Sequence, residues 1–211
     1  MSAQQNFLFE KLNSFFTEAQ SGFHLINEQR KRLLHEIAEY ILQKKLSNTK
    51  TNLTFICTHN SRRSHISQIM AQAAAAYYGV HNVYCYSGGT EVTAFNENAV
   101  HALQQIGFEI IAKDKTSNPV YEVGFASNAN KLKAFSKLYT DVSNPQKDYG
   151  AVLTCSSADA SCPIVQGADG RFKLPYEDPK LSDGTPQQTA VYLERSKQIG
   201  TEMLYVFSLV K

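Results

Sequence analysis

The feature that most constrains the fold is an abrupt change of pattern in the first third of the chain. The apolar run LTFIC at 53–57 is typical of a strand buried on both faces. The alanine-rich stretch SQIMAQAAAAYYG at 67–79 is typical of a helix that ends at a glycine. A strand, a short polar loop and a helix in this order form the repeating unit of a parallel sheet covered by helices.

The same alternation continues along the chain. NVYCYS at 82–87 and YGAVLTC at 149–155 are predicted strands, and NENAVHALQQIG at 96–107 is a predicted helix. A last helix with Thr185 as its N-cap is predicted to follow. We therefore expect an α/β fold with an open, mostly parallel four-stranded sheet and helices on both of its faces.

Two segments depart from this alternation. Residues 1–48 predict an N-terminal helical extension of two helices, whose apolar stripes we expect to pack on the main domain or on a partner subunit, which would make a homodimer. The main domain is predicted at 49–211. It contains an insertion at about 113–148, where apolar and polar residues alternate around SNAN and predict a β-hairpin-like element.

Composition argues against several classes of protein. A chain of 211 residues with 43% hydrophobic residues can bury one good-sized core, and a formal net charge of +2 does not favour binding to nucleic acid. No run reaches the ~18–20 apolar residues that a membrane helix needs. Glu10 and Lys11 interrupt the N-terminal apolar stretch, so no signal peptide is expected. Four cysteines make a poor disulfide scaffold, and we expect a cytoplasmic protein with reduced thiols.

Cys57 stands at the carboxyl end of the first predicted strand, where open parallel sheets bind their ligands. The N-terminus of the next helix offers free N–H groups and partial positive charge, which favour a thiolate and hold an oxyanion. Arg63 adds a planar fork that matches two oxyanion oxygens, and Ser64 can donate its hydroxyl to the sulfur. The stretch CTHNSRRS at 57–64 therefore predicts a nucleophile within an oxyanion cradle.

Cys155 and Cys162 flank the polar stretch SSADAS after a predicted strand. Their spacing is not CxxC and no second pair of ligands is near, so we expect no zinc site, no other metal and no cofactor. A polar loop between two cysteines can rearrange and allow thiol–disulfide exchange. Burial of two small residues remains the alternative, since free cysteines are often buried. Cys85 alternates with Val83 and is assigned to the core.

On these residues the chain resembles the low-molecular-weight protein tyrosine phosphatase superfamily, which includes the thioredoxin-coupled arsenate reductases. CTHNSRRS is similar to the phosphate-binding loop of that family, and the likeness continues through SGGTEVTAFNENAVHALQQIGFEI, AVLTCSSADASCP and YEDP. It covers most of residues 53–210. The resemblance implies a substrate-binding loop that consists of Thr58, His59, Asn60, Ser61, Arg62 and Arg63. It implies as catalytic residues Cys57, Arg63, Ser64, Asp178, Cys155 and Cys162.

Three positions depart from the pattern of the family. His59 stands where the family usually has glycine, and it must tolerate a positive φ at some cost if that position requires one. Arg62 replaces a frequent cysteine, and its charge should strengthen the attraction of anions. Gln68 replaces a helix glutamate, so the cation site known in some reductases lacks one of its groups here.

The resemblance implies one of two reactions. In arsenate reduction Cys57 attacks arsenate, Asp178 of the Asp-Pro pair assists as general acid, and Cys155 and Cys162 carry the oxidation away for thioredoxin to reverse. In phosphomonoester hydrolysis Cys57 forms a phosphoenzyme, with Asp178 as acid and then base. Glu177 is a weaker candidate for the acid.

Two sequence features favour the reductase. The second and third cysteines are superfluous for hydrolysis, and the residues after Asp-Pro are not the aromatic ones that phosphatases of the family tend to have. Those residues are Lys180, Leu181 and Ser182. A protein that binds an oxyanion or senses redox state without turnover is the third hypothesis.

Overall fold

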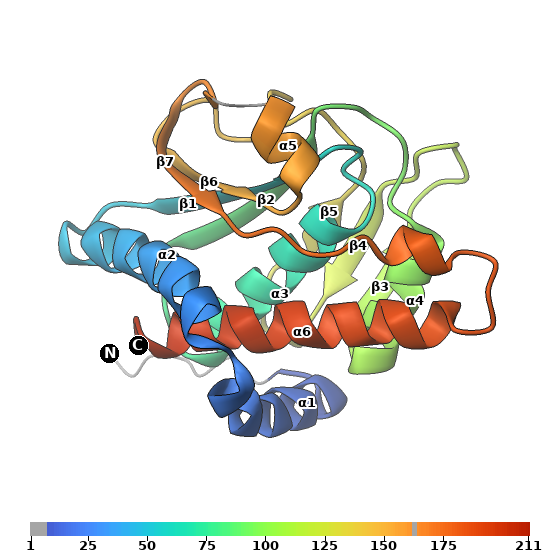
Figure 1. Cartoon of the computed structure of the whole chain (residues 1–211), viewed down its shortest axis with the longest axis horizontal. Helices are drawn as coiled ribbons and strands as arrows, with labels where there is room; N and C mark the ends of the chain where they lie inside the picture. Colours follow the sequence, from blue (N-terminus) through green and yellow to red (C-terminus); the bar gives the residue numbers. More distant parts are fainter. Residues whose placement is uncertain (1–7, 162–163) are drawn as a thin grey trace.

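An open parallel sheet of four strands forms the centre of the protein, in a computed structural model that describes residues 8–161 and 164–211 (Figure 1). The strands are β1 (Thr51–Cys57), β2 (Val83–Gly89), β6 (Tyr149–Leu153) and β7 (Ala168–Lys173). Their order in the sheet is β2-β1-β6-β7, and every neighbouring pair is parallel. The predicted fold class is confirmed.

Helices cover both faces of this sheet. The helices α3 (Arg63–Tyr77), α4 (Glu97–Ile106) and α6 (Gln188–Ser208) lie below it in Figure 1, and the short α5 (Ser156–Ser161) lies above. The long α6 packs on both α3 and α4. Across the described ranges, no helix combines the length and the apolar character that crossing a bilayer would require.

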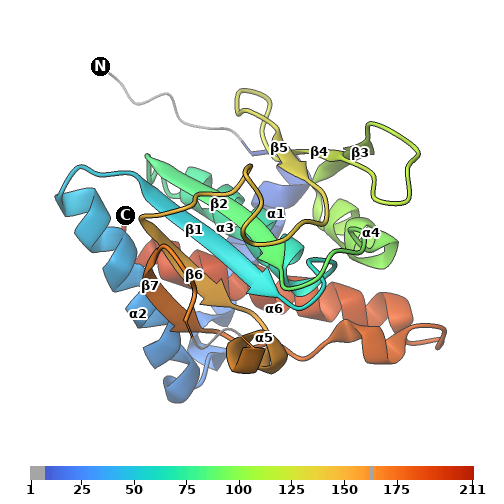
Figure 2. The same cartoon turned by 90° about the horizontal axis from the view of Figure 1, so that it is seen from above.

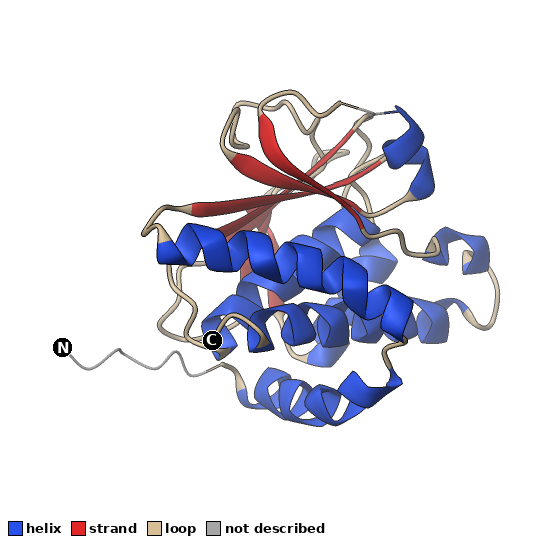
Figure 3. Cartoon of the chain, turned by 60° about the vertical axis from the view of Figure 1, so that its left-hand side comes forward, coloured by secondary structure: helices blue, strands red, loops and turns tan. Residues whose placement is uncertain are grey.

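The two predicted N-terminal helices are present. They are α1 (Glu10–Ser21) and α2 (Glu28–Leu46), joined by a 3-10 turn, and both pack on α6 of the same chain (Figure 3). The side chain of Asn27 caps α2 by accepting a hydrogen bond from the backbone N–H of Arg30, at 2.8 Å. Phe16 is fully buried in the main core. The extension therefore shares one core with the sheet.

The predicted hairpin is also present, and it recruits a further strand. β4 (Tyr121–Gly124) pairs with β5 (Leu132–Ala134), and β3 (Glu109–Ala112) adds to β4, all antiparallel. This second sheet lies beyond β2 (Figure 2). After β5 the chain returns to β2, where the N–H of Gly89 donates to the carbonyl of Lys137 at 2.8 Å. The insertion therefore reaches the carboxyl end of the main sheet.

The start of α6 differs from the prediction that Thr185 is its N-cap. The helix begins at Gln188, and the hydroxyl of Thr185 instead donates to the carbonyl of Ser182. Gly184 has φ +76°, which forms a turn before the helix. The side chain of Gln188 accepts from the N–H of Gly184 at 2.8 Å, so it stabilises this turn.

His65 is a fully buried histidine on α3. Its ring stacks on Phe95 with centroids 4.2 Å apart. Neither ring nitrogen has a hydrogen bond of good geometry, although the backbone of Phe135 and Ser61 is close enough to favour the charged form slightly. Burial, helped by the charge of Lys137, lowers the pKa of His65 to about 3. The ring is therefore neutral at ordinary pH.

Phe16→Ala should destabilise the protein by about 3–5 kcal/mol, because it leaves a cavity beneath the extension. The ring of Phe16 makes an edge contact with Tyr77 of α3, with centroids 5.5 Å apart. Urea unfolding measures the loss, and Leu46→Ala is the control because Leu46 is 78% exposed. A loss below about 1 kcal/mol for Phe16→Ala would contradict the shared core.

His65→Leu should remove part of the acid sensitivity of the fold. Below pH 6.5 the unfolded state binds a proton at His65 that the folded state, with its pKa near 3, does not bind. Stability is therefore lost as pH falls, by about 2 kcal/mol at pH 5 relative to pH 8 from this group. Unfolding free energies of wild type and variant should diverge over this range. If the unfolding free energy of wild type and of His65→Leu depended equally on pH, the assignment would be refuted. The control is His101→Gln, which changes an exposed histidine.

Candidate active site

The sulfur of Cys57 lies at the carboxyl end of β1, 3.1 Å from the hydroxyl oxygen of Ser64 in the first turn of α3. The side-chain amide of Asn60 donates to the same hydroxyl at 2.9 Å. Since that amide nitrogen can only donate, the hydroxyl of Ser64 accepts there and is free to donate its own hydrogen to the sulfur.

The orientation of the Asn60 amide follows from its other contact. Its side-chain oxygen accepts the backbone N–H of Lys137 at 2.9 Å, so its nitrogen must face Ser64. Asn60 is fully buried and has φ +44°. Asparagine is one of the residues that tolerate this region of backbone space.

His59 stands where the family usually has glycine, so a positive φ was considered for it. In the structure Asn60 has the positive φ, and His59 does not. The ring of His59 is half exposed and lies 3.3 Å from the carboxylate of Glu91. The carbonyl of His59 accepts the hydroxyls of Ser136, at 2.9 Å, and of Thr93, at 3.1 Å. His59 thus contributes its backbone to the shape of the loop.

The loop leaves a row of donors free. The backbone N–H groups of residues 58–63 donate to no acceptor among the described residues. Such N–H groups ahead of a helix form an anion-binding cradle. Gly89 permits this shape, because a Cβ there would lie 2.6 Å from the carbonyl oxygen of Thr58 and 2.7 Å from the N–H of Asn60.

The insertion supplies a buried cation behind this loop. Lys137 is only 5% exposed, and burial lowers its pKa to about 8, opposed by the nearby Asp141. No carboxylate of the described residues forms an ion pair with it. Lys137 is mostly charged at neutral pH, and it favours negative charge in its surroundings. Sequence reasoning missed Ser136 and Lys137, because the insertion carries no motif at these positions.

The two arginines of the loop point to different partners. Arg63 forms an ion pair with Asp178 at 2.6 Å and donates to the carbonyl of Tyr176 at 3.0 Å. Arg62 donates to the hydroxyl of Tyr192 at 2.6 Å and pairs with Asp183 at 2.9 Å. Arg63 therefore stands with the predicted acid, while Arg62 ties the loop to α6.

The ion pair of Arg63 with Asp178 lies in a crevice of about 650 Å³, which Ser156, Leu181 and Thr185 also line. The carboxylate of Asp178 also accepts the N–H of Lys180 at 3.1 Å, at the start of a 3-10 turn. The crevice gives a substrate room to reach both charges.

Cys155 lies beside the loop. Its sulfur is 3.5 Å from the hydroxyl of Thr58, the residue next to Cys57, and it accepts the N–H of Ala158 at 3.3 Å. Cys57 and Cys155 belong to the same small apolar cluster, which also contains Ala158 of α5. Cys162 lies outside the described residues.

Cys85 is buried as predicted, and burial raises the pKa of its thiol. Within the described residues, no three His, Cys, Asp or Glu side chains gather closely enough to hold a metal ion.

Comparisons with known proteins agree with this geometry. The model of the family described as low molecular weight phosphotyrosine protein phosphatase matches residues 52–126, which include the whole loop. The arsenate reductase of Shouchella clausii is 26% identical over 156 residues, covering 74% of this chain and 94% of that protein. The arsenate reductase of Bacillus subtilis is 26% identical over 150 residues, covering 71% and 89%.

A solved structure of a mutant of YwlE from Bacillus subtilis shares the fold, with a TM-score of 0.51 at 15% identity over 75% of this chain and 97% of that chain. The matched family and the two curated relatives are enzymes, which confirms the prediction of an enzyme. The chain thus resembles the low molecular weight phosphotyrosine protein phosphatase family and the curated arsenate reductases in sequence, and the solved YwlE structure in fold.

Proposed function

We propose that the protein is an arsenate reductase, with Cys57 as nucleophile and Cys155 and Cys162 as a redox relay. The observation that carries the proposal is the second thiol beside the nucleophile: the Cys155 sulfur contacts Thr58, the neighbour of Cys57. A hydrolase has no use for a thiol there. The arsenate reductases among the relatives support the same choice.

Substrate binding uses the free donors of the loop. Arsenate is a tetrahedral oxyanion, and the N–H groups of residues 58–63 together with the Arg63 fork match its oxygens. The anion competes with Asp178 for Arg63, since the two now form an ion pair at 2.6 Å. Binding therefore frees the carboxyl group of Asp178 to take up a proton and act as an acid.

The chemistry consumes two thiol equivalents. The Cys57 thiolate bonds to arsenic, and a hydroxyl leaves as water with the proton of Asp178. Cys155 then attacks the sulfur of Cys57, the sulfur–arsenic electron pair goes to arsenic, and arsenite departs as As(III). Cys162 attacks the sulfur of Cys155 in turn, which leaves a Cys155–Cys162 disulfide and returns the Cys57 thiol.

A dithiol reductant must then reduce this disulfide, and thioredoxin fits that role. Transfer of two electrons from its dithiol regenerates both thiols of the relay and leaves thioredoxin oxidised. Thioredoxin is the reductant that the resemblance to thioredoxin-coupled enzymes implies.

Phosphomonoester hydrolysis is the second candidate, because an oxyanion cradle with a cysteine and an acid serves it equally well. Cys57 would displace the alcohol while Asp178 protonates it, and water would then hydrolyse the phosphoenzyme. Leu181 is 90% exposed at the crevice and could contact an apolar substrate group, but it offers no aromatic face. We expect phosphatase activity to be the weaker of the two.

Arsenate-dependent oxidation of NADPH, coupled through thioredoxin and thioredoxin reductase, should require three cysteines. Cys57→Ser, Cys155→Ser and Cys162→Ser should each reduce steady-state turnover to background, because each removes one transfer of the relay. Cys85→Ala is the matched control: its buried thiol lies outside the site, so turnover should be retained. The measurement is the rate of absorbance loss of NADPH.

Hydrolysis of an aryl phosphate, measured on the same variants, separates the two reactions. Turnover that needs Cys57 but survives loss of Cys155 and Cys162, with no reduction of arsenate, would overturn the reductase in favour of a phosphatase. Absence of both activities, with a Cys57 no more reactive toward iodoacetamide than an ordinary thiol, would point to a binding protein without turnover.

A further inference from the structure

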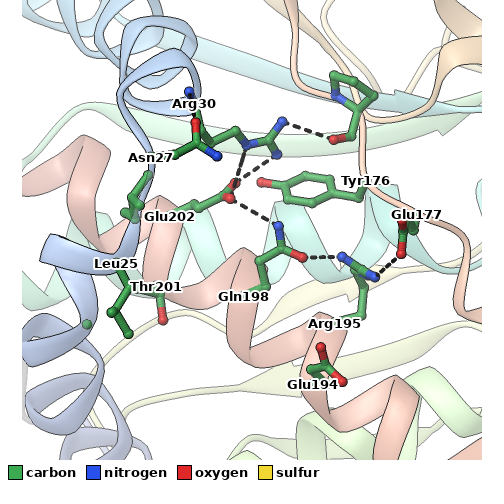
Figure 4. A pocket seen from close by; sticks show the side chains of 13 residues that line it. Leu25, Asn27, Arg30, Tyr176, Glu177, Glu194, Arg195, Gln198, Thr201 and Glu202 are labelled. Carbon is green, nitrogen blue, oxygen red and sulfur yellow. Dashed lines mark hydrogen bonds and ion pairs between the residues drawn. The ribbon is translucent and has the colours of Figure 1, made fainter.

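The N-terminal extension contacts the segment that carries Asp178. Arg30 of α2 is bidentate to the carboxylate of Glu202 on α6, with three nitrogen–oxygen distances of 2.8 to 3.0 Å. Its remaining terminal nitrogen donates to the carbonyl of Pro175 at 3.0 Å (Figure 4). One guanidinium group thus joins α2, α6 and the segment before the acid.

The same guanidinium covers an aromatic ring of that segment. The central carbon of Arg30 lies 4.5 Å from the ring centre of Tyr176, which is 5% exposed. Burial holds the pKa of the Tyr176 hydroxyl well above its usual range, so the ring is neutral and presents its face to the cation. Figure 4 shows Tyr176 between Arg30 and Glu177, beside a cavity of about 560 Å³.

The segment is held from the active-site side as well. The carbonyl of Tyr176 accepts from Arg63, whose other terminal nitrogen reaches Asp178. The N–H of Tyr176 donates to the carbonyl of Thr154 at 3.1 Å, next to Cys155. Tyr176 therefore connects Arg30 on one side to the catalytic loop on the other.

The next residue, Glu177, forms an ion pair with α6. Glu177 lies 3.1 Å from Arg195 of α6, and its side chain is 88% exposed (Figure 4). This ion pair of Glu177 with Arg195 is separate from the ion pair of Asp178 with Arg63. The weaker candidate acid is thereby engaged elsewhere.

We propose that Arg30 is a positioning residue for the acid step: it fixes Pro175 and Tyr176, so that Asp178 is held over the loop of Cys57. The role of Asp178 in this inference rests on the proposed function. Lysine cannot replace Arg30, because one planar group binds a carboxylate, donates to a carbonyl and covers a ring at once. The N-terminal extension is then part of the active site in function.

The contacts of Arg30 with Glu202, Pro175 and Tyr176 together form a clamp on the segment before Asp178. Loss of this clamp should affect the acid step and leave anion binding intact. Asp178→Asn should lower kcat for arsenate roughly 10²–10⁴-fold, as loss of a general acid does. Arg30→Met should lower kcat at least roughly tenfold. The double variant Arg30→Met/Asp178→Asn should have the same kcat as Asp178→Asn alone. Protection of Cys57 from iodoacetamide by inorganic phosphate should be unchanged, because the loop donors are untouched.

Two further variants distinguish a specific effect on the acid step from a general loss of folding. Arg30→Met/Glu202→Gln removes the unpaired buried carboxylate that the single substitution leaves behind, and it should show the same loss of kcat. Arg32→Met makes the same change at an exposed position of α2 and should retain wild-type kcat. Wild-type kcat in Arg30→Met, or losses that multiply with those of Asp178→Asn, would overturn the proposal.

Hydrogen exchange separates failure of this inference from failure of the proposed function. Should the wild-type protein turn over neither arsenate nor an aryl phosphate, the proposed function is wrong, and exchange in peptides that cover residues 174–178 still tests the clamp. Faster exchange there in Arg30→Met than in Arg32→Met supports the clamp. Equal exchange overturns it.

Discussion

The geometry of the site depends on one hydrogen-bond relay that begins at the backbone of Lys137 and ends at the sulfur of Cys57. It passes through both ends of the Asn60 amide and through the hydroxyl of Ser64. Because the relay starts at an N–H, which can only donate, every donor and acceptor along it has a fixed direction. The sulfur of Cys57 is therefore the acceptor at the end of the relay, and the hydroxyl of Ser64 is its donor.

Both halves of the site are supported by segments outside the strand–loop–helix unit that carries Cys57, the proposed nucleophile. The insertion supports the loop through Ser136 and Lys137. The N-terminal extension contacts the segment before Asp178 through Arg30. Each support acts on backbone atoms and buried side chains, so each sets position and takes no part in bond making. A small catalytic unit can in this way gain rigidity from elements added around it.

The sequence predicted the elements whose signals are local. The predicted strand LTFIC is β1 in the structure, and the hairpin around SNAN lies where its alternating pattern predicted it. β7 was not predicted, because ADGRFK has a glycine and three charged residues and, as an edge strand, is only partly buried. The contact of Arg30 with Glu202 joins positions 172 residues apart and leaves no periodic trace in the sequence.

In the proposed reaction, Arg63 links substrate binding to the acid step, because one of its two partners is a carboxylate and the other is a backbone carbonyl. Its contact with Asp178 is an ion pair that an oxyanion can replace, whereas its contact with the carbonyl of Tyr176 carries no net charge. An arriving anion therefore replaces the first contact and leaves the second in place. Tyr176 stays fixed by Arg30 meanwhile, so Asp178 loses its countercharge without losing its place. In the proposed reaction the contacts of Arg30 matter most at that moment, when Asp178 is released beside the substrate that it would protonate.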